Sequence, residues 1–337
     1  MMQRDFRYVL AVDGGQSSTA CVLGTTGGEI LAVGHGGPAN HVHQPGGPER
    51  LRRAIVESAG EARARGGNPP RFAAIYLALT GGAREGEEIA RANFDAEAIL
   101  AEGDPPAALA SGTFGGPGIG LIAGTGAVAI AETARGERID RGGWGYLVGD
   151  EGSGYWIGMA AVQAAARALD GRGPSTVLVE RVPEFFGAPN LRVVASRIYG
   201  FELERPQVAA LTPVVLDAAA RSDAVAVGIV DMAAEELVLL LESVARAAAF
   251  AEERERVIVA TGGVLRPGNL LWQKLAAGIE SRLSGFRLIE PRFPPVIGAY
   301  VLALRLAGVT VDERVIDCIG RSSEHFPALA GKRPVRM

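Results

Sequence analysis

Residues 8–18 of the chain read YVLAVDGGQSS, and the fold is first indicated here. The apolar, uncharged run at 8–12 stops at Asp13-Gly14-Gly15, which is the pattern of a short buried strand that ends in a tight turn. Two further strands, joined by a glycine turn, are expected at 19–23 and 29–33. The chain is therefore expected to begin as a β-meander with a glycine-rich first turn.

The opening pattern returns later in the chain. Residues 120–131 read GLIAGTGAVAIA, a strand, a glycine turn and a return strand, about 110 residues after the first copy. Two copies at that distance indicate a duplicated supersecondary element and not a solenoid, whose repeats are shorter and more numerous. Other helices are expected at 48–65, 152–169, 227–248, 269–282 and 296–306, and other strands at 73–79, 98–101, 257–260 and 287–289. This alternation predicts an α/β protein in two similar halves, 1–114 and 115–337.

The bulk composition excludes several classes of protein. The chain has 337 residues, of which 48% are hydrophobic and 21% charged, enough apolar material for two cores. A net charge of -4 without a basic stripe argues against nucleic acid or an anionic membrane as a partner. The N-terminal apolar run is too short for a signal peptide or a membrane span, so a cytoplasmic protein is expected. Two cysteines without a C-x-x-C pair predict neither a disulfide framework nor a zinc site.

Three apolar strands each end in a glycine turn that carries a hydroxyl residue. The turns are 13–17, 124–126 and 261–263. One such turn is usually only a tight corner, but three suggest backbone loops that converge on a polyanion. Glycine lets amide N–H groups point at phosphate oxygens, and Ser or Thr adds a hydroxyl donor. The chain has no Walker A sequence and no G-x-G-x-x-G after its first strand, so a nucleotide triphosphate would be held by another architecture.

Two aspartates end strands near these turns. Asp13 faces the first turn, where a carboxylate would repel phosphate unless a cation lay between them, so Mg²⁺ is implied. The alternative for Asp13 is an ordinary Asx turn. Asp104 precedes Pro105-Pro106, which is a standard helix start with Asp at the N-cap. A capping carboxylate at a strand end can also face a cleft, and in phosphoryl transfer such an Asp accepts the proton of the attacking hydroxyl.

Residues 142–158 read GGWGYLVGDEGSGYWIG, dense in glycine, aromatic and acidic residues just before a helix. Exposed backbone, an aromatic face and a carboxylate suit a sugar, which offers hydroxyls and a C–H face. The alternative is an N-capped helix with aromatic core residues, and Trp156 is expected to be core. Asn40, in the loop after the third strand, is either a turn residue or a ligand contact.

Together, these segments resemble the N-acetylglucosamine kinase group within the BadF/BadG/BcrA/BcrD ATPase family, from about Tyr8 to Leu306 and in the same order. Residues 142–158 are the most specific part of the likeness. The resemblance implies two ribonuclease-H-like domains, as in actin, Hsp70 and hexokinase, around a cleft for nucleotide and sugar. It implies a homodimer that uses Mg-ATP to phosphorylate an amino sugar, with the 6-hydroxyl of N-acetylglucosamine as the first choice of acceptor.

The resemblance also assigns roles to single residues. Asp104 matches the catalytic base, and Asp13 matches the acidic position associated with Mg²⁺. The phosphate loops match at Gly14, Gly15 and Ser17 and at Gly124, Thr125 and Gly126, and the loop beside the adenosine matches at Gly262 and Gly263. The expected sugar contacts are Asn40, Asp104, Gly143, Trp144, Gly145 and Asp150.

Several alternatives stay open at this point. The substrate could be glucosamine or N-acetylmuramic acid, and the chain could be a non-kinase, activator-type ATPase or a sugar sensor without catalysis. Activators of this family need cysteines for a bridging iron–sulfur cluster. The expected position of Cys21 within a strand and of Cys318 near the C-terminus disfavours that role. The zinc motif of the ROK sugar kinases is missing as well.

Overall fold

The computed structural model describes residues 7–16, 18–39, 42, 44–248, 250 and 256–329. The chain divides into two compact units, a first unit of Met1–Gly116 with Pro291–Met337 and a second unit of Pro117–Glu290. The sequence placed 115–337 together in one domain. In the structure the chain returns to the first unit at Pro291, because the last long helix packs on the first sheet.

The first unit is built on a five-stranded sheet of order β3-β2-β1-β4-β5. Its strands are β1 (Tyr8–Gly14), β2 (Thr19–Thr25), β3 (Ile30–Gly36), β4 (Arg71–Leu79) and β5 (Asp95–Gly103). Its helices are α1 (Gly47–Arg65), α2 (Ala83–Asn93), α3 (Pro105–Thr113), α11 (Pro295–Leu306) and α12 (Glu313–Ser323). β1, β2 and β3 pair antiparallel, which confirms the predicted meander, and β4 and β5 run parallel to β1.

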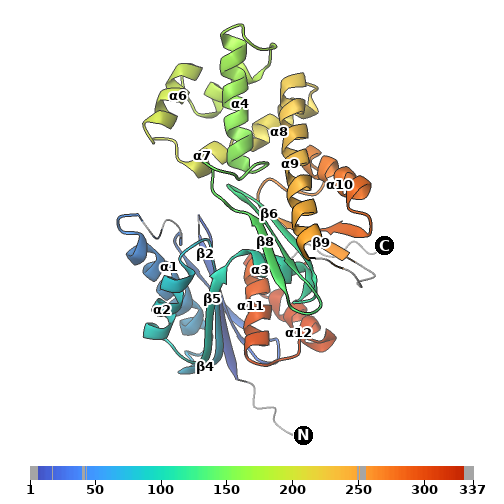
Figure 1. The fold of residues 1–337 in the computed structure, drawn as a ribbon. Coiled ribbons are helices and arrows are strands. Elements are labelled where there is room, and N and C mark those ends of the chain that lie inside the picture. Colours follow the sequence, from blue (N-terminus) through green and yellow to red (C-terminus); the bar gives the residue numbers. More distant parts are fainter. Residues whose placement is uncertain are drawn as a thin grey trace. The chain divides into compact units, whose positions relative to one another are not determined.

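Helices cover both faces of this sheet, and the alternation of side chains along β1 shows why. Helices α1 and α2 lie on one face, and α3, α11 and α12 lie on the other (Figure 1). Leu10 and Val12 belong to the core on the first face, and Val9 and Ala11 belong to the core on the second. A strand buried on both faces reads as a continuous apolar run, as residues 8–12 do.

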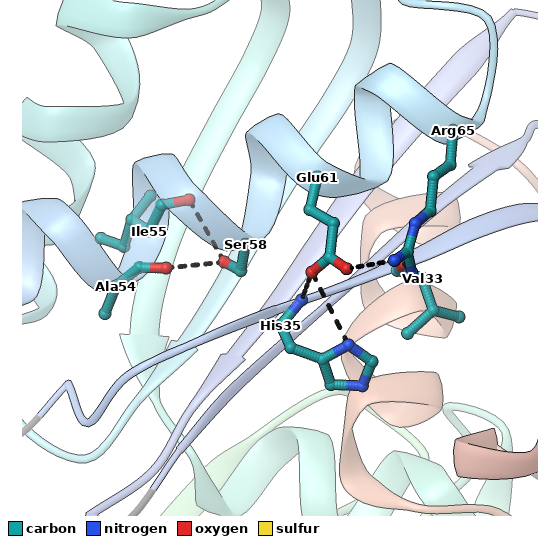
Figure 2. A network of polar contacts seen from close by, with 7 residues as sticks. All are labelled: Val33, His35, Ala54, Ile55, Ser58, Glu61 and Arg65. Atoms are coloured by element: carbon teal, nitrogen blue, oxygen red, sulfur yellow. Dashed lines mark hydrogen bonds and ion pairs between the residues drawn. The ribbon is translucent and has the colours of Figure 1, made fainter.

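Helix α1 is fastened to β3 by close contact and by polar bonds. A Cβ at Gly34 would lie 2.0 Å from the carbonyl oxygen of Ser58, so only glycine lets the helix come this near. Figure 2 shows the polar part, in which Glu61 accepts a 2.6 Å hydrogen bond from the backbone N–H of His35 and pairs with Arg65 at 2.7 Å. These contacts fix the end of β3 against α1.

Helix α11 holds α3 in the same manner. A Cβ at Gly298 would lie 1.8 Å from the carbonyl oxygen of Ala107. The two helices therefore touch backbone to backbone, and α11 also packs on β1 and β4. The start of α3, where Asp104 lies, is thus positioned by the C-terminal part of the chain.

The second unit repeats the first sheet. Its strands are β6 (Gly118–Ala123), β7 (Ala127–Glu132), β8 (Arg138–Gly142), β9 (Arg256–Thr261) and β10 (Phe286–Ile289), in the order β10-β9-β6-β7-β8. β6, β7 and β8 pair antiparallel, and β9 and β10 run parallel to β6. In both units the order along the sheet is third, second, first, fourth and fifth strand. The expectation of two ribonuclease-H-like α/β units is confirmed.

Most of the second unit outside its sheet is helical. The helices are α4 (Gly154–Leu169), α5 (Leu178–Phe185), α6 (Leu191–Tyr199), α7 (Arg205–Ala209), α8 (Thr212–Ala220), α9 (Ala224–Ala248) and α10 (Leu270–Arg282). The predicted apolar stripe of α9 is buried in the core, for example at Val230, Leu237 and Leu241. Trp156, which the sequence places in the core, is only partly buried and packs against the outside of that core. None of the described helices combines the length and the apolar character needed to cross a membrane.

Candidate functional site

Three parallel strands of the first unit end at one edge of its sheet. The register pairs Gly14 of β1 with Leu79 of β4, and Leu79 with Gly103 of β5. Asp13 lies on β1 one residue before that edge, and Asp104 directly follows β5. The structure therefore brings Asp13, the first glycine turn and Asp104 together, at the carboxyl ends of strands where open α/β sheets bind ligands.

The first turn is closed by backbone hydrogen bonds. The N–H of Gly15 donates to Ser18 O at 3.0 Å, and the N–H of Ala39 donates to Gly15 O at 3.0 Å. A Cβ at Gly14 would lie 2.7 Å from Leu79 Cδ2 and 2.8 Å from Ala39 Cβ, so a larger residue does not fit there without a shift of the neighbouring chain. Ser17 and Asn40 lie outside the described residues, and their roles stay predictions.

Asp104 is the N-cap residue of α3, the position that the Asp-Pro-Pro sequence predicted. Among the described residues, however, its side chain makes no capping hydrogen bond to α3. Its Oδ2 instead accepts a 2.8 Å hydrogen bond from the hydroxyl of Thr80. Burial raises the pKa of the Asp104 carboxyl, and the bond from Thr80 opposes part of that rise. The carboxylate is thus partly buried and oriented by Thr80, and it makes no bond that caps the helix.

Asp13 lies within the electrostatic reach of Asp104. Burial raises the pKa of Asp13 to about 7, and the negative charge of Asp104 adds to the rise. Two carboxylates at one strand edge resist ionising together unless a cation joins them. The described residues hold no group of three or more His, Cys, Asp or Glu placed to bind a metal. Mg²⁺ commonly binds through one or two carboxylates, with water and phosphate as its other ligands, so the pair fits a magnesium-nucleotide.

The raised pKa of Asp13 predicts a pH-dependent stability in magnesium-free buffer. Between pH 3.8 and about 7, the folded protein keeps a proton on Asp13 that the unfolded chain, with the ordinary pKa of 3.8, has released. The stability that depends on this bound proton is fully present below pH 3.8 and is lost as the pH rises through about 7. The free energy of unfolding is expected to fall by roughly 2 to 4 kcal/mol over that range, and Asp13→Asn should remove the fall. Urea unfolding of both proteins at several pH values measures it. A constant difference between them would contradict the raised pKa.

The strand edge of the second unit carries the other two predicted turns. A Cβ at Gly262 would lie 2.1 Å from the carbonyl oxygen of Ala123, and its φ of 105° favours glycine as well. A Cβ at Gly124 or Gly263 would meet no described atom within 4 Å. The turn of Gly124-Thr125-Gly126 and the loop at Gly262-Gly263 therefore lie side by side, with two glycines open to the approach of a ligand.

The predicted sugar segment packs over the turn at 124–126. Asp150 is buried, has a φ of 62°, and its Oδ1 accepts a hydrogen bond from the N–H of Ala127 at 3.4 Å. A Cβ at Gly126 would lie 2.8 Å from Asp150 Oδ2. Burial raises the pKa of Asp150, and the amide of Ala127 and the charge of Arg205 oppose the rise. The carboxylate of Asp150 thus joins the segment at 142–158 to the turn at 124–126.

A cavity of about 320 Å³ opens beside this segment. It is lined by Ala127, Arg141, Gly142, Trp144, Asp150 and Glu151 and, from α9, by Glu236, Leu239, Leu240 and Ser243. The indole of Trp144 is largely exposed, which leaves its face free for a sugar ring. Gly143 and Gly145 flank it with φ of 69° and 83°. Three carboxylates and one guanidinium line the cavity, so its charge is negative.

Sequence reasoning missed two of these positions. Thr80 begins a Thr-Gly-Gly sequence directly after β4, and the same three residues occur at 261–263, where Thr261 is the last residue of β9. Searching for that repeat would have found Thr80. Glu236 was missed because the periodicity of α9 identifies only its core-facing side. Sequence alone does not say what the opposite side of the helix meets.

Comparison with known proteins places the chain among ATPases and sugar kinases. A model of the BadF/BadG/BcrA/BcrD ATPase family matches residues 10–303. The chain is 28% identical over 303 residues to an N-acetylmuramic acid/N-acetylglucosamine kinase of Clostridium acetobutylicum, covering 88% of this chain and 98% of the relative. It is 28% identical over 313 residues to an N-acetyl-D-glucosamine kinase of Dictyostelium discoideum, with 88% and 97% covered. A crystal structure from Chromobacterium violaceum, provisionally named an N-acetylglucosamine kinase, is 30% identical with a TM-score of 0.70, covering 88% and 99% of the two chains.

Proposed function

Because the chain belongs to the BadF/BadG/BcrA/BcrD ATPase family, we propose that it transfers the γ-phosphoryl group of ATP to an amino sugar, with the 6-hydroxyl of N-acetylglucosamine as acceptor. The proposal rests on the way in which the Asp104 side chain is held. This carboxylate stands at a helix N-cap without capping the helix and is held by Thr80 beside Asp13. The sugar kinases among its relatives supply the class of substrate.

In the proposed reaction Asp104 is the general base. As the 6-oxygen of the sugar bonds to the γ-phosphorus and the bond to ADP breaks, the hydroxyl proton passes to the Asp104 carboxylate. The raised pKa of Asp104 makes it a stronger base than an exposed aspartate. Mg²⁺, when bound near Asp13, would neutralise charge on the phosphate oxygens. Gly14 and Gly15 in the first unit, and Gly124, Thr125, Gly126, Gly262 and Gly263 in the second, would bind the nucleotide through their backbone.

The sugar is proposed to bind along Gly143, Trp144, Gly145 and Asp150. Asn40 and Asp104 are its other proposed contacts. The cavity beside Trp144 lies at the low end of the ~300–1,000 Å³ typical of ligand sites, a size that suits a single sugar ring. Asp150 would accept hydrogen bonds from sugar hydroxyls, and the indole would cover the C–H face.

The test is a coupled ADP-release assay with Mg-ATP and a panel of N-acetylglucosamine, glucosamine, N-acetylmannosamine, N-acetylmuramic acid and glucose. Turnover should be fastest with N-acetylglucosamine and absent without sugar. A flat panel from a protein that still binds ATP would contradict the kinase function. It would favour the activator-type ATPase, for which the part of the chain that the structure describes offers only a buried Cys21 and a partly buried Cys318 as cysteines.

The charge of the cavity predicts discrimination within that panel. Asp150, Glu151 and Glu236 outnumber Arg141, so the lactyl carboxylate of N-acetylmuramic acid should be repelled, and its kcat/KM should be at least tenfold below that of N-acetylglucosamine. Glu236→Gln should reduce the ratio of kcat/KM between N-acetylglucosamine and N-acetylmuramic acid by about five- to tenfold. The reason is that the repulsion between two unit charges about 4 Å apart is worth about 1 kcal/mol in water. Glu235→Gln is the matched control. Glu235 precedes Glu236 on α9, pairs with Arg282 and is not among the residues that line the cavity. Equal kcat/KM for both sugars in the wild type would contradict the prediction.

Two further parts belong to the proposal. A homodimer rests on the family likeness alone, and a cytoplasmic location rests on the short apolar run at the N-terminus. Light scattering coupled to size-exclusion chromatography tests the first, and a monomer at micromolar concentration would contradict it. Cell fractionation with antibody detection tests the second.

A further inference from the structure

Thr80 ties together the ends of the three parallel strands in the first unit. It follows β4 directly, and its N–H donates a 2.9 Å hydrogen bond to the carbonyl oxygen of Gly14, at the end of β1. Its hydroxyl donates the 2.8 Å hydrogen bond to Asp104 Oδ2, just after β5. One residue therefore connects the first phosphate turn to the proposed base.

The second unit shows that this arrangement is not a general requirement of the fold. β9 occupies the same place in its sheet as β4, and there the backbone bond to the end of the first strand, β6, is made by the N–H of Val264, which donates to the carbonyl oxygen of Ala123 at 3.3 Å. Val264 carries no hydroxyl, whereas the hydroxyl of Thr80 bonds to an ionisable side chain outside the sheet.

Asp104 needs such a partner because the helix does not hold its side chain. An N-cap aspartate is normally fixed by the amides of the first helical turn. Here the described residues offer the Asp104 side chain no capping bond, and the hydroxyl of Thr80 takes that place. A carboxylate accepts about four hydrogen bonds, so a donor on Oδ2 sets its orientation and still leaves lone pairs for a substrate hydroxyl.

We propose that Thr80 is a positioning residue for catalysis, whose hydroxyl orients the Asp104 carboxylate and ties that orientation to the turn at Gly14. The inference rests on the proposed role of Asp104 as the base. A base must lie within hydrogen-bond reach of the proton that it takes, so a carboxylate free to rotate spends less time in the reactive position. The effect belongs to the chemical step and not to the binding of ATP or sugar.

The test compares Thr80→Val, which has nearly the same shape without the hydroxyl, with Thr80→Ser, which keeps the hydroxyl. Thr80→Val is expected to lower kcat roughly 10- to 100-fold, the loss expected for a hydrogen bond to a charged group, and to leave KM for ATP and for the sugar within about twofold. Thr80→Ser should retain kcat within about threefold of the wild type. Thr113→Val is the control, because Thr113 lies on α3 and its hydroxyl bonds only to the carbonyl oxygen of Leu109 among the partners described.

The outcomes separate this inference from the proposed function. Wild-type kcat in Thr80→Val, together with an inactive Asp104→Asn, overturns the role of Thr80 and leaves the base in place. Equal losses in Thr80→Val and Thr80→Ser also overturn it, because packing and not the hydroxyl would then matter. Full activity of Asp104→Asn would instead defeat the proposed base. If Thr80→Val does not fold, as judged by its thermal melt against Thr113→Val, Thr80→Ala replaces it with the same expected loss of kcat.

Discussion

Turnover by the Asp104→Asn variant is expected to fall about 10²- to 10⁴-fold, the contribution usual for a general base, while ATP still binds. Asparagine keeps the shape of the side chain and can still accept a hydrogen bond from Thr80 through its amide oxygen. It cannot take the proton of the sugar hydroxyl. Steady-state ADP release gives kcat, and calorimetric titration with a non-hydrolysable ATP analogue gives the affinity for nucleotide.

A matched control lies at the opposite end of the same strand. Asp95 begins β5 and pairs only loosely with Arg71, at 3.9 Å on the surface. Asp95→Asn should therefore retain wild-type kcat. If Asp104→Asn turned over sugar within about threefold of this control, Asp104 would not be the base.

The Gly262→Ala variant is expected to unfold its unit at much lower denaturant concentration, with a loss of about 3 kcal/mol or more. The added methyl group would lie 2.1 Å from the carbonyl oxygen of Ala123, and that atom is backbone and cannot rotate away. The φ of 105° adds strain for any residue with a side chain. Urea unfolding followed by circular dichroism measures the loss. ATP affinity should fall with it, because the turn at 124–126 must shift.

Gly263 supplies the comparison for this variant. It is the next residue, its φ is not in the left-handed region, and a Cβ there would meet no described atom within 4 Å. Gly263→Ala should leave the unfolding free energy within about 1 kcal/mol of the wild type. Any loss of ATP affinity in Gly263→Ala would then come from the ligand meeting the methyl group. Equal stability of the two variants would show that the loop at Gly262 relaxes freely.

The repeated strand–turn–strand pattern predicted the fold because the apolar run and the glycine turn that mark each strand are adjacent in the sequence. The run at 8–12 is apolar without interruption since β1 is buried on both faces, and Asp13-Gly14-Gly15 marks where it ends. The stripe of α9 was equally clear over a long helix. The place of Asp104 at a helix start followed from its two prolines.

Other features depend on residues far away in the sequence and could not be predicted from local patterns. Helices α5 to α8 have only five to nine residues each, too few for a clear period. Nothing around Pro291 signals a return to the first unit, because α11 is apolar on nearly all sides and does not specify its partner. The bond from Thr80 to Asp104 joins residues 24 apart whose strands are neighbours only in the sheet.

The interrupted first unit has a consequence for synthesis of the protein on the ribosome. When residues up to Gly116 have been made, the face of β1 that bears Val9 and Ala11 still lacks α11, and α3 lacks the helix that holds it. The whole of Pro117–Glu290 is translated first, which takes roughly 10 to 35 s at ordinary elongation rates. The later, continuous unit can thus reach its native state before the earlier one is completed. During that interval the nascent chain carries an uncovered apolar sheet face, the kind of surface that chaperones bind.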